Sequence, residues 1–359
     1  MTHQTGTTGD AAEGHATLRS RVAIGLVAAL LAGVYTWFQH HYLVARGSAP
    51  DSLVLWRAAN VLLNGENPWQ RDALDLVSAP MRQLNEDARI RLGDPLFYPM
   101  PAVLLWTPLA RLPFLVASTI FNVFAAFLFV FAITRDGLYR AWACGSVPFM
   151  MAMRFGQWSP LLVAAFSYPA LSFFLLAKPN LGLSLYLSRP TRMATIVCAI
   201  ALLTTTALAP WWVRDWLRNV QNDLGHAAPH PIPATMFGGA GAAILLALLR
   251  WRRPEARLVA FLACVPQLPY WADQLPLLLV PSSRREMQGM MLVTIVGFLC
   301  WVQFGGPGDF IDTIRPFAIV FTYAPAVLLV LSRRNERPGD IDTVSSASTA
   351  KPPAVKSAR

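Results

Sequence analysis

The sequence predicts an all-α polytopic membrane protein, on three observations. Of its 359 residues, 55% are hydrophobic and only 14% are charged, and the mean hydropathy is +0.42, which is more apolar than a soluble domain of this size. Apolar runs with few charges recur along the chain, and the longest reach the roughly 20 residues that a helix needs to cross a bilayer. Basic residues cluster between these runs, as the positive-inside rule predicts.

The apolar runs predict roughly nine to eleven transmembrane helices, because half-helices are tolerated where protein covers their ends. The longer runs cover 22–45, 113–134, 155–177, 193–213, 231–249, 258–272, 287–308 and 316–332, and shorter ones cover 97–110, 138–153, 180–188 and 276–281. Pro160, Pro169 and Pro179 interrupt the stretch 159–187. Since proline breaks the hydrogen-bond ladder of a helix, we expect a broken or re-entrant segment there.

The basic clusters set the expected orientation in an inner, or plasma, membrane. The arginines that we place in the cytoplasm are Arg19, Arg21, Arg250, Arg252, Arg253, Arg257, Arg284, Arg285, Arg333, Arg334 and Arg337. This orientation makes 19–332 the membrane domain, with 39–96 as its first external loop. The polar ends, 1–18 and 333–359, are expected to be disordered and cytoplasmic. The net charge of +10 is scattered in clusters, which argues against a nucleic-acid partner.

Asp51 is the strongest candidate for chemistry. It follows the first apolar run in Ala49-Pro50-Asp51-Ser52, and the residues after it have the period of an interfacial helix that ends near Gly65. A carboxylate held beside a membrane surface is a candidate base for chemistry on a lipid-linked substrate. The structural alternative is that Asp51 only caps this helix by accepting hydrogen bonds from its backbone amides.

Four further segments follow Asp51 in order: Leu63-Asn64-Gly65-Glu66-Asn67-Pro68-Trp69, Tyr98-Pro99-Met100-Pro101, Gly156-Gln157-Trp158-Ser159 and Ala177-Lys178-Pro179. Each also has a structural reading. Tyr98 suits an aromatic belt at the interface, Gln157 suits a hydrogen bond between helices, and Lys178 suits a cation that extends to the interface from a span end.

This ordered set, which covers about the first half of the chain, resembles the polytopic glycosyltransferases of family 87. That family includes bacterial mannosyltransferases that use polyprenyl-phosphate mannose. Met100 stands where the family usually has a second proline, and Ser159 stands where it usually has Asn. The resemblance implies the GT-C architecture, a helical bundle with interfacial helices in the first external loop and an outward-facing active site.

The resemblance also implies a reaction. A polyprenyl-phosphate-linked sugar, mannose by the family's example, would pass with inversion to an external glycan or glycolipid acceptor, with Asp51 as general base. The candidates for binding the donor's phosphate or sugar are Lys178, Arg154, Gln157, Arg57 and Tyr98, because the leaving phosphate needs charge stabilisation more than a proton. The candidate pocket residues are Asn64, Asn67, His230, Gln267 and Asp273.

The sequence indicates no cofactor and no metal-binding motif. Its cysteines, Cys144, Cys198, Cys264 and Cys300, are isolated in apolar runs, where a free thiol behaves as a small hydrophobe. The need for a divalent ion stays open. Two other classes also stay open: a transporter or flippase for a lipid-linked substrate, which inverted repeats and charges midway along spans would indicate, and a catalytically inactive relative of the family.

Overall fold

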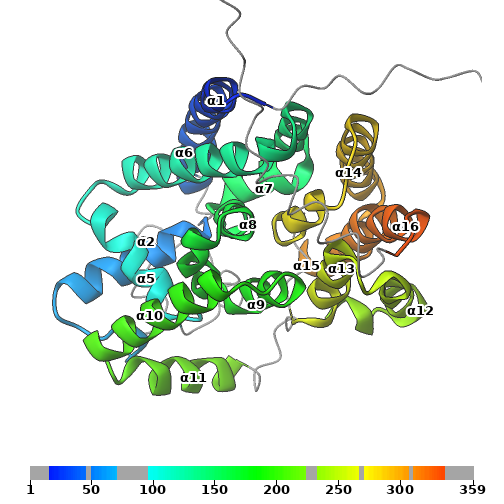
Figure 1. Ribbon diagram of the computed structural model, residues 1–359. Coiled ribbons are helices and arrows are strands. Elements are labelled where there is room, and N and C mark those ends of the chain that lie inside the picture. Colours follow the sequence, from blue (N-terminus) through cyan, green and yellow to red (C-terminus); the bar gives the residue numbers. More distant parts are fainter. Residues whose placement is uncertain are drawn as a thin grey trace, which may run out of the picture.

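The computed structural model describes residues 16–45, 50–70, 96–223, 233–266, 271–306 and 310–335, and these residues form helices and no strands (Figure 1). The first half contains α1 (Leu18–Ala45), α2 (Asp51–Leu63), η1 (Pro68–Gln70), α5 (Met100–Trp106), η3 (Thr107–Leu109), α6 (Phe114–Ile133), η4 (Thr134–Asp136), η5 (Leu138–Gly145), α7 (Val147–Phe155), α8 (Ser159–Ser167), η6 (Pro169–Ala177) and α9 (Pro179–Ser188). The second half contains α10 (Arg192–Leu208), α11 (Trp212–Asp223), η7 (Ala234–Met236), α12 (Gly238–Ala243), η8 (Ile244–Arg250), α13 (Pro254–Cys264), η9 (Trp271–Leu279), α14 (Arg284–Phe304), α15 (Phe310–Ala318), the π-helix η10 (Ile319–Tyr323) and α16 (Ala324–Ser332).

Four helical stretches in the described residues are long and apolar enough to cross a membrane: Leu18–Leu43, Phe114–Asp136, Arg284–Phe304 and Thr313–Ser332. A fifth results if α10 and α11, which are bent by 99° at their junction, are counted as one span. The helices and their four apolar stretches support the prediction of an all-helical membrane protein. The expected total of nine to eleven spans stays a prediction.

Local sequence accounts for the ends of these helices. Pro113 precedes the first residue of α6, where its fixed φ suits the start of a helix. Ser283 caps α14 by accepting a hydrogen bond from the backbone N–H of Glu286 at 3.3 Å. The Glu286 carboxylate in turn accepts from the backbone N–H of Ser282, which satisfies a second amide at this helix start.

The stretch 159–187 is broken, as its prolines predict. It forms the separate helices α8, η6 and α9, each 9 or 10 residues long, with breaks at Tyr168 and Lys178. Pro169 and Pro179 follow these two breaks directly, and the residue before a proline is disfavoured in helical conformation. At 1.5–2 Å per residue such segments cover only about half of the ~30 Å hydrocarbon layer.

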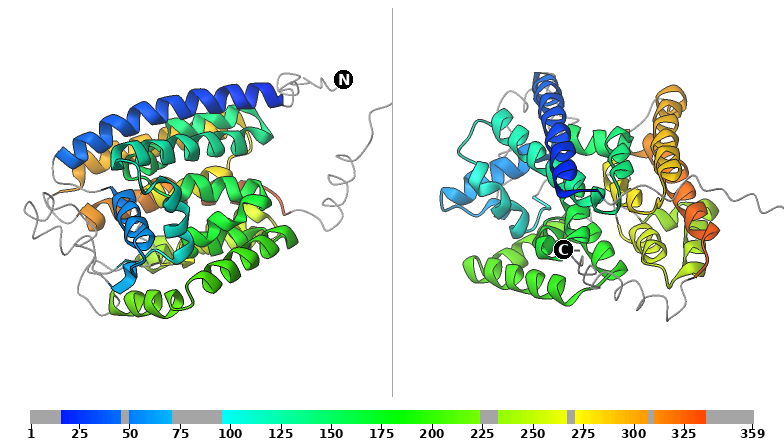
Figure 2. Two further views of the ribbon diagram at one scale, coloured as in Figure 1. Left: turned by 90° about the vertical axis from the view of Figure 1, so that its left-hand side faces the viewer. Right: turned by 45° about the horizontal axis from the view of Figure 1, so that its top comes forward.

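The helices run between two ends, which are best seen in the left view of Figure 2. At one end, Arg21 at the start of α1 donates to the carbonyl oxygen of Phe131 near the end of α6, at 2.6 Å. At the other, His40 near the end of α1 stacks on Phe114 at the start of α6, with ring centroids 6.0 Å apart. We call the first the arginine end and the second, which carries α2, the loop end.

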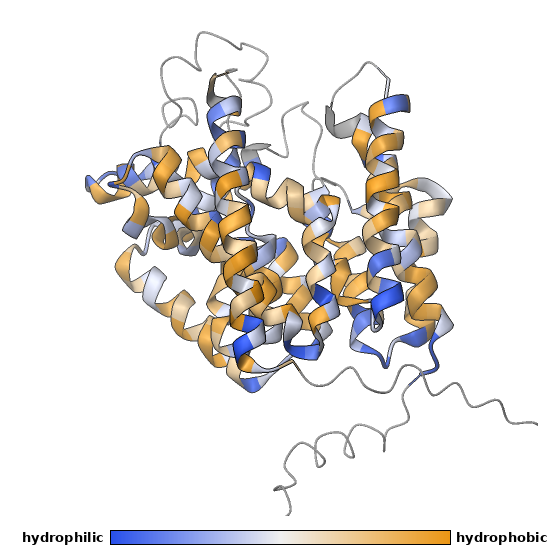
Figure 3. Ribbon diagram, turned by 90° about the horizontal axis from the view of Figure 1, so that it is seen from above, coloured by the Kyte–Doolittle hydropathy of each residue, from blue (hydrophilic) through white to orange (hydrophobic). Residues whose placement is uncertain are grey.

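The two ends hold the basic residues on either side of α6. Arg135 and Arg140 follow α6 at the arginine end, where Arg140 donates to the carbonyl oxygen of Leu279 at 3.4 Å. Arg111 precedes α6 at the loop end and donates to the side chain of Asn64 at 3.2 Å. Figure 3 shows hydrophobic residues along the helical bodies and hydrophilic ones gathered toward their ends.

The exposed surface of the long helices is apolar. Leu30 on α1, Leu203 on α10 and Leu299 on α14 are 69%, 69% and 58% exposed. The interior holds closely packed aromatic rings, including Trp106 and Phe121, whose ring centroids lie 4.6 Å apart. Large apolar side chains exposed along the long helices are suited to a lipid solvent.

Candidate active site

Asp51, Gln157, Lys178 and Asp273 form one hydrogen-bonded network at the loop end. The amide nitrogen Nε2 of Gln157 donates to Oδ2 of Asp51. The ammonium nitrogen Nζ of Lys178 donates to Oε1 of Gln157 at 3.0 Å and to Oδ1 of Asp273 at 2.6 Å. The structure therefore brings together four of the residues that the sequence singled out, from four separate parts of the chain.

The chemistry of its neighbours fixes how the Gln157 amide is oriented. An ionised carboxylate only accepts hydrogen bonds and an ammonium group only donates them. The amide satisfies both when its NH₂ group faces Asp51 and its oxygen faces Lys178, which is the arrangement observed. Gln157 thus links the acid to the cation, which do not contact each other directly in this network.

Tyr98 is a second partner of Asp51, through a side-chain hydrogen bond in which the phenol O–H donates to the carboxylate. The backbone around Tyr98 is held in place as well, because the indole N–H of Trp69 donates to its carbonyl oxygen at 3.1 Å. The segment that the sequence marked by its prolines therefore brings a phenol to the candidate base.

Asp51 does not cap α2, which corrects the structural alternative. Pro50 occupies the N-cap position with extended backbone, no side chain caps the helix, and Asp51 is its first residue. The hydrogen-bond partners of the Asp51 side chain are Gln157 and Tyr98. The interfacial helix itself is as predicted, since α2 ends at Leu63 and Gly65 follows with φ +79°.

A tight contact between Ser52 and Gly156 places Gln157 beside Asp51. Gly156 ends α7 in the left-handed conformation, with φ +64°. A Cβ atom at this position would lie 2.5 Å from the Oγ atom of Ser52. Only glycine allows both this backbone conformation and this approach, so the start of α2 packs against the turn that carries Gln157.

Lys178 and Asp273 reach the network from helix junctions. Lys178 lies between η6 and α9 with φ −138° and ψ 81°, outside the helical region that is disfavoured before a proline. Asp273 lies in the first turn of η9. Their side chains are 17% and 3% exposed, and Asp51 is partly exposed. Solvent therefore reaches the network from the side of Asp51 and Lys178.

The charges of the network favour a basic carboxylate at Asp51. Burial raises the pKa of the Asp51 carboxyl group above its ordinary value, and the negative charge of Asp273 acts in the same direction. The positive charge of Lys178 and the hydrogen bond from Gln157 oppose this rise without cancelling it. Two carboxylates share one ammonium group, and the direct ion pair belongs to Asp273. Asp51 is therefore the carboxylate that has no direct ion pair within the network and lies on its more exposed side.

The remaining candidates that the structure describes lie outside this network. Arg57 lies further along α2, with its guanidinium 5.2 Å from the Trp56 ring centroid. Arg154, in the last turn of α7, lies 5.7 Å from the Phe155 ring centroid.

Asn64 and Asn67 belong to the turn after α2. Asn64 is the C-cap of that helix and accepts from Arg111, while Asn67 donates to Asp215 at 2.8 Å. His230 and Gln267 lie outside the described residues, as does the part 71–95 of the first external loop.

Sequence reasoning missed Asp215 and Asn219, two buried polar residues on α11 that hold the described part of the first loop. Asp215, 3% exposed, accepts from Asn67 and from Arg214. Asn219 donates to the carbonyl oxygens of Trp69 and Leu96 at 3.2 and 3.3 Å. The signal was the spacing of four between Asp215 and Asn219, which puts both on one face of a helix.

Two further kinds of feature could mark a site in the described residues: a small hollow in the surface and clusters of metal-binding side chains. A small hollow between α8, η6, α9 and α10 is lined by Phe166, Ser172 and Arg189, among others, and by none of the four network residues. Within the described ranges, no cluster of three or more His, Cys, Asp or Glu side chains is arranged to hold a metal ion.

Comparisons with protein families, with curated proteins and with solved structures find no match to this chain.

Proposed function

We propose that this chain is a membrane glycosyltransferase similar to family 87. It transfers a sugar, mannose as the first candidate, from polyprenyl phosphate to an external glycan or glycolipid, with inversion. The observation that carries the proposal is the contact of three motif residues that are distant in sequence. Gln157 follows Asp51 by 106 residues and precedes Lys178 by 21, and it bonds to both.

The chemistry assigns each network residue a task. Asp51 removes the proton from an acceptor hydroxyl as its oxygen attacks the anomeric carbon of the donor sugar. A bond forms from that oxygen to the carbon while the bond from the carbon to the phosphate oxygen breaks, and the leaving polyprenyl phosphate takes the electron pair. Attack from the face opposite the leaving group inverts the anomeric configuration. The pKa raised by burial makes Asp51 a stronger base than an exposed aspartate.

Lys178 stabilises the negative charge that grows on the leaving phosphate. Its side chain is 17% exposed, and its ammonium group already donates hydrogen bonds to Asp273 and Gln157. Asp273 holds the ammonium group in one position through their hydrogen-bonded ion pair. Tyr98 and Gln157 orient the Asp51 carboxylate.

The membrane arrangement follows from the charge of the two ends. With the arginine end in the cytoplasm, the loop end and Asp51 face outward across a plasma membrane. We propose a GT-C bundle of nine to eleven spans, in which the short segments α7, α8, η6, α9, α13 and η9 supplement the four long ones. Lipid tails of the donor lie against the apolar helices, and its phosphate lies near Lys178.

The position of the Lys178–Asp273 ion pair favours the enzyme over a transporter. Coupling charges of transporters lie near the bilayer midplane in discontinuous helices. Lys178 lies at the break before α9 and Asp273 lies in the first turn of η9, and both belong to the network that includes Asp51, the first residue of α2. A position at the loop end, near the membrane surface, suits a reaction between a lipid-linked donor and an external acceptor.

The test is sugar transfer by membranes that contain Asp51→Asn or Asp51→Ala protein. Both variants are expected to lose transfer of radiolabelled sugar from polyprenyl phosphate by at least about 100-fold, because the general base is gone. Asp136→Asn is the matched control, since Asp136 lies at the arginine end with a side chain 66% exposed. An Asp51→Ala protein that keeps wild-type activity would exclude the proposed base.

Mass spectrometry of the purified protein separates the reaction classes. We expect polyprenyl-phosphate sugar to copurify with the Asp51→Asn protein, which binds the donor without consuming it. A flippase would bind the same lipid and move it across vesicles without transferring its sugar. An inactive relative would tolerate Asp51→Ala and show no bound lipid.

A further inference from the structure

The arginine end has a continuous basic surface in which arginines serve two different purposes. The described part of this end has three carboxylates, Asp136, Glu255 and Glu286, and each lies within 4 Å of an arginine nitrogen. The acids are thus already paired. Among the described residues, no carboxylate forms an ion pair with the remaining arginines at this end.

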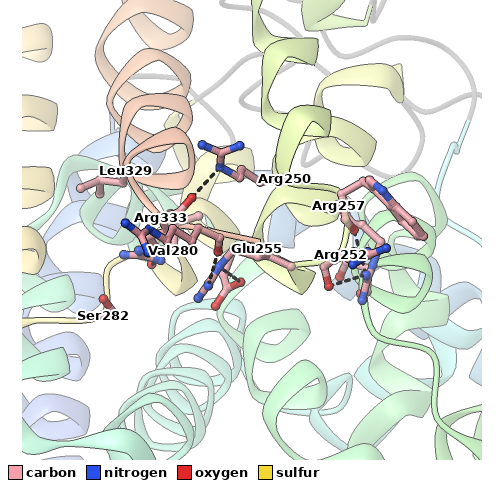
Figure 4. Close-up of polar contacts among 12 residues, drawn as sticks. Arg250, Arg252, Glu255, Arg257, Val280, Ser282, Leu329 and Arg333 are labelled. Carbon is pink, nitrogen blue, oxygen red and sulfur yellow. Dashed lines mark hydrogen bonds and ion pairs between the residues drawn. The ribbon is translucent and has the colours of Figure 1, made fainter. Parts of the chain in front are cut away.

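One group of arginines joins the ends of helices. Arg250 donates to the carbonyl oxygen of Arg333 at 2.5 Å, and Arg333 donates to that of Val280 at 2.8 Å (Figure 4). Arg257 donates to the carbonyl oxygen of Ser188 at 3.0 Å. These bonds connect η8, α9, α13, η9 and α16. The guanidinium groups of Arg250, Arg257 and Arg333 therefore serve the fold.

A second group remains exposed on the same surface: Arg252, Arg284, Arg285 and Arg334. Arg252 and Arg334 lie next to Arg253 and Arg333, and Arg284 and Arg285 directly precede Glu286. Arg253, next to Arg252, donates to the carbonyl oxygen of Arg334 at 3.0 Å, and Glu286, next to Arg285, pairs with Arg333 at 2.5 Å. The four exposed guanidinium groups therefore border one connected region.

The basic surface adjoins an exposed apolar one. Leu246, Leu249 and Trp251 are 50%, 61% and 59% exposed at the end of η8. The guanidinium of Arg252 lies 5.9 Å from the Trp251 ring centroid. Tryptophan beside leucine on one side and arginine on the other is the pattern of a membrane interface, where apolar side chains meet lipid tails and cations meet headgroups.

We propose that this surface, made of Arg252, Arg284, Arg285, Arg334 and Trp251, binds the headgroups of anionic phospholipids. Arginine suits the phosphate because its planar guanidinium donates two parallel hydrogen bonds. The glycerol backbone and acyl chains lie against Trp251 and the leucines of η8. The proposal concerns the end opposite to Asp51 and is independent of the proposed reaction.

The test measures binding of phosphatidylglycerol and of phosphatidylcholine to the purified full-length protein by native mass spectrometry. We expect the wild type to retain phosphatidylglycerol preferentially. Arg252→Gln/Arg334→Gln is expected to weaken that binding about fivefold for each arginine removed, the effect of losing one cation at an anionic membrane surface. Arg284→Gln/Arg285→Gln is a second variant with the same expectation, should the first fail to fold.

The control is Arg111→Gln/Arg218→Gln, which removes two exposed arginines from the loop end and is expected to leave binding unchanged. Equal retention of the two lipids by the wild type, an equal loss in the control, or no loss in either folded variant would each overturn the proposal. Excess inorganic phosphate at constant ionic strength is expected to leave the lipid bound. Its displacement would identify a site for free phosphate, and the proposed lipid site would be wrong.

Discussion

Lys178 and Asp273 form an ion pair with 2.6 Å between Nζ and Oδ1, although 95 residues separate them in the sequence. This contact places the cation directly against one carboxylate and leaves the other, Asp51, to reach it through the amide of Gln157. The two acids therefore differ in how well their charges are compensated. The role of general base suits Asp51, the carboxylate whose negative charge is not directly paired with the ammonium group.

The first prediction concerns the pH dependence of sugar transfer. Asp51 works as a base only when ionised, so the rate falls as the pH drops through its pKa. Burial raises this pKa, so the fall is expected at a higher pH than for an ordinary aspartate. Lys178→Met removes a charge that lowers the pKa of Asp51, and moves the fall to still higher pH. Asp273→Asn removes a charge that raises the pKa, and moves the fall to lower pH.

The measurement is kcat against pH for the wild type and both variants at saturating donor. Asp136→Asn at the arginine end is expected to leave the profile in place. Shifts of the same sign in Lys178→Met and Asp273→Asn would contradict the electrostatic account.

The second prediction concerns stability. Removing one partner of a largely buried ion pair leaves the other charge uncompensated, which costs about 3 to 5 kcal/mol. We expect Lys178→Met and Asp273→Leu each to lower the thermal unfolding temperature in detergent, and the double variant Lys178→Met/Asp273→Leu to recover most of the loss. Additive losses in the double variant would show that the two side chains do not stabilise each other.

The third prediction concerns the turn before Gln157. Gly156→Ala combines a positive φ with a Cβ atom 2.5 Å from Ser52 Oγ, so it should displace Gln157 from Asp51 and lower kcat. Gly65→Ala is the matched control, because Gly65 also has a positive φ, +79°, but nothing lies within 4 Å of the added Cβ. It carries only the conformational cost of about 1 to 2 kcal/mol. Equal loss of activity in the two variants would exclude a specific role for the Ser52 contact.

The fourth prediction concerns the attachment of the first loop to α11. The Asn67–Asp215 hydrogen bond has a buried ionised acceptor, and bonds of this kind contribute about 1.5 to 3 kcal/mol. A double-mutant cycle with Asn67→Ala and Asp215→Ala is expected to give a coupling free energy of about 1 to 2 kcal/mol, measured by chemical unfolding in detergent. A coupling near zero would mean that α11 and the turn at Asn67 are held together by other contacts.

Some of the candidate site was predictable because it depends on local rules. The helix 51–63 follows from its period and ends at Gly65, and the break at Lys178 follows from Pro179. The capping role of Asp51 was a wrong alternative, because capping is local and the sequence does not show that Gln157 and Tyr98 lie close enough to compete for the carboxylate. Asp215 escaped notice because Trp211, Trp212 and Trp216 around it suit an aromatic belt, and because its partner Asn67 lies 148 residues away in the sequence.

The sequence by itself determined that the chain is helical and apolar enough for a membrane, in which stretches the four long helices lie, and which polar side chains interrupt the apolar runs. These properties depend on neighbours within a few residues, through proline, glycine, helical period and charge. Tertiary structure alone decided that Gln157 lies between Asp51 and Lys178, that Lys178 pairs with Asp273, and which arginines bind backbone carbonyls and which stay exposed. Contacts across 95 or 106 residues depend on how helices pack, and packing is a property of the whole chain.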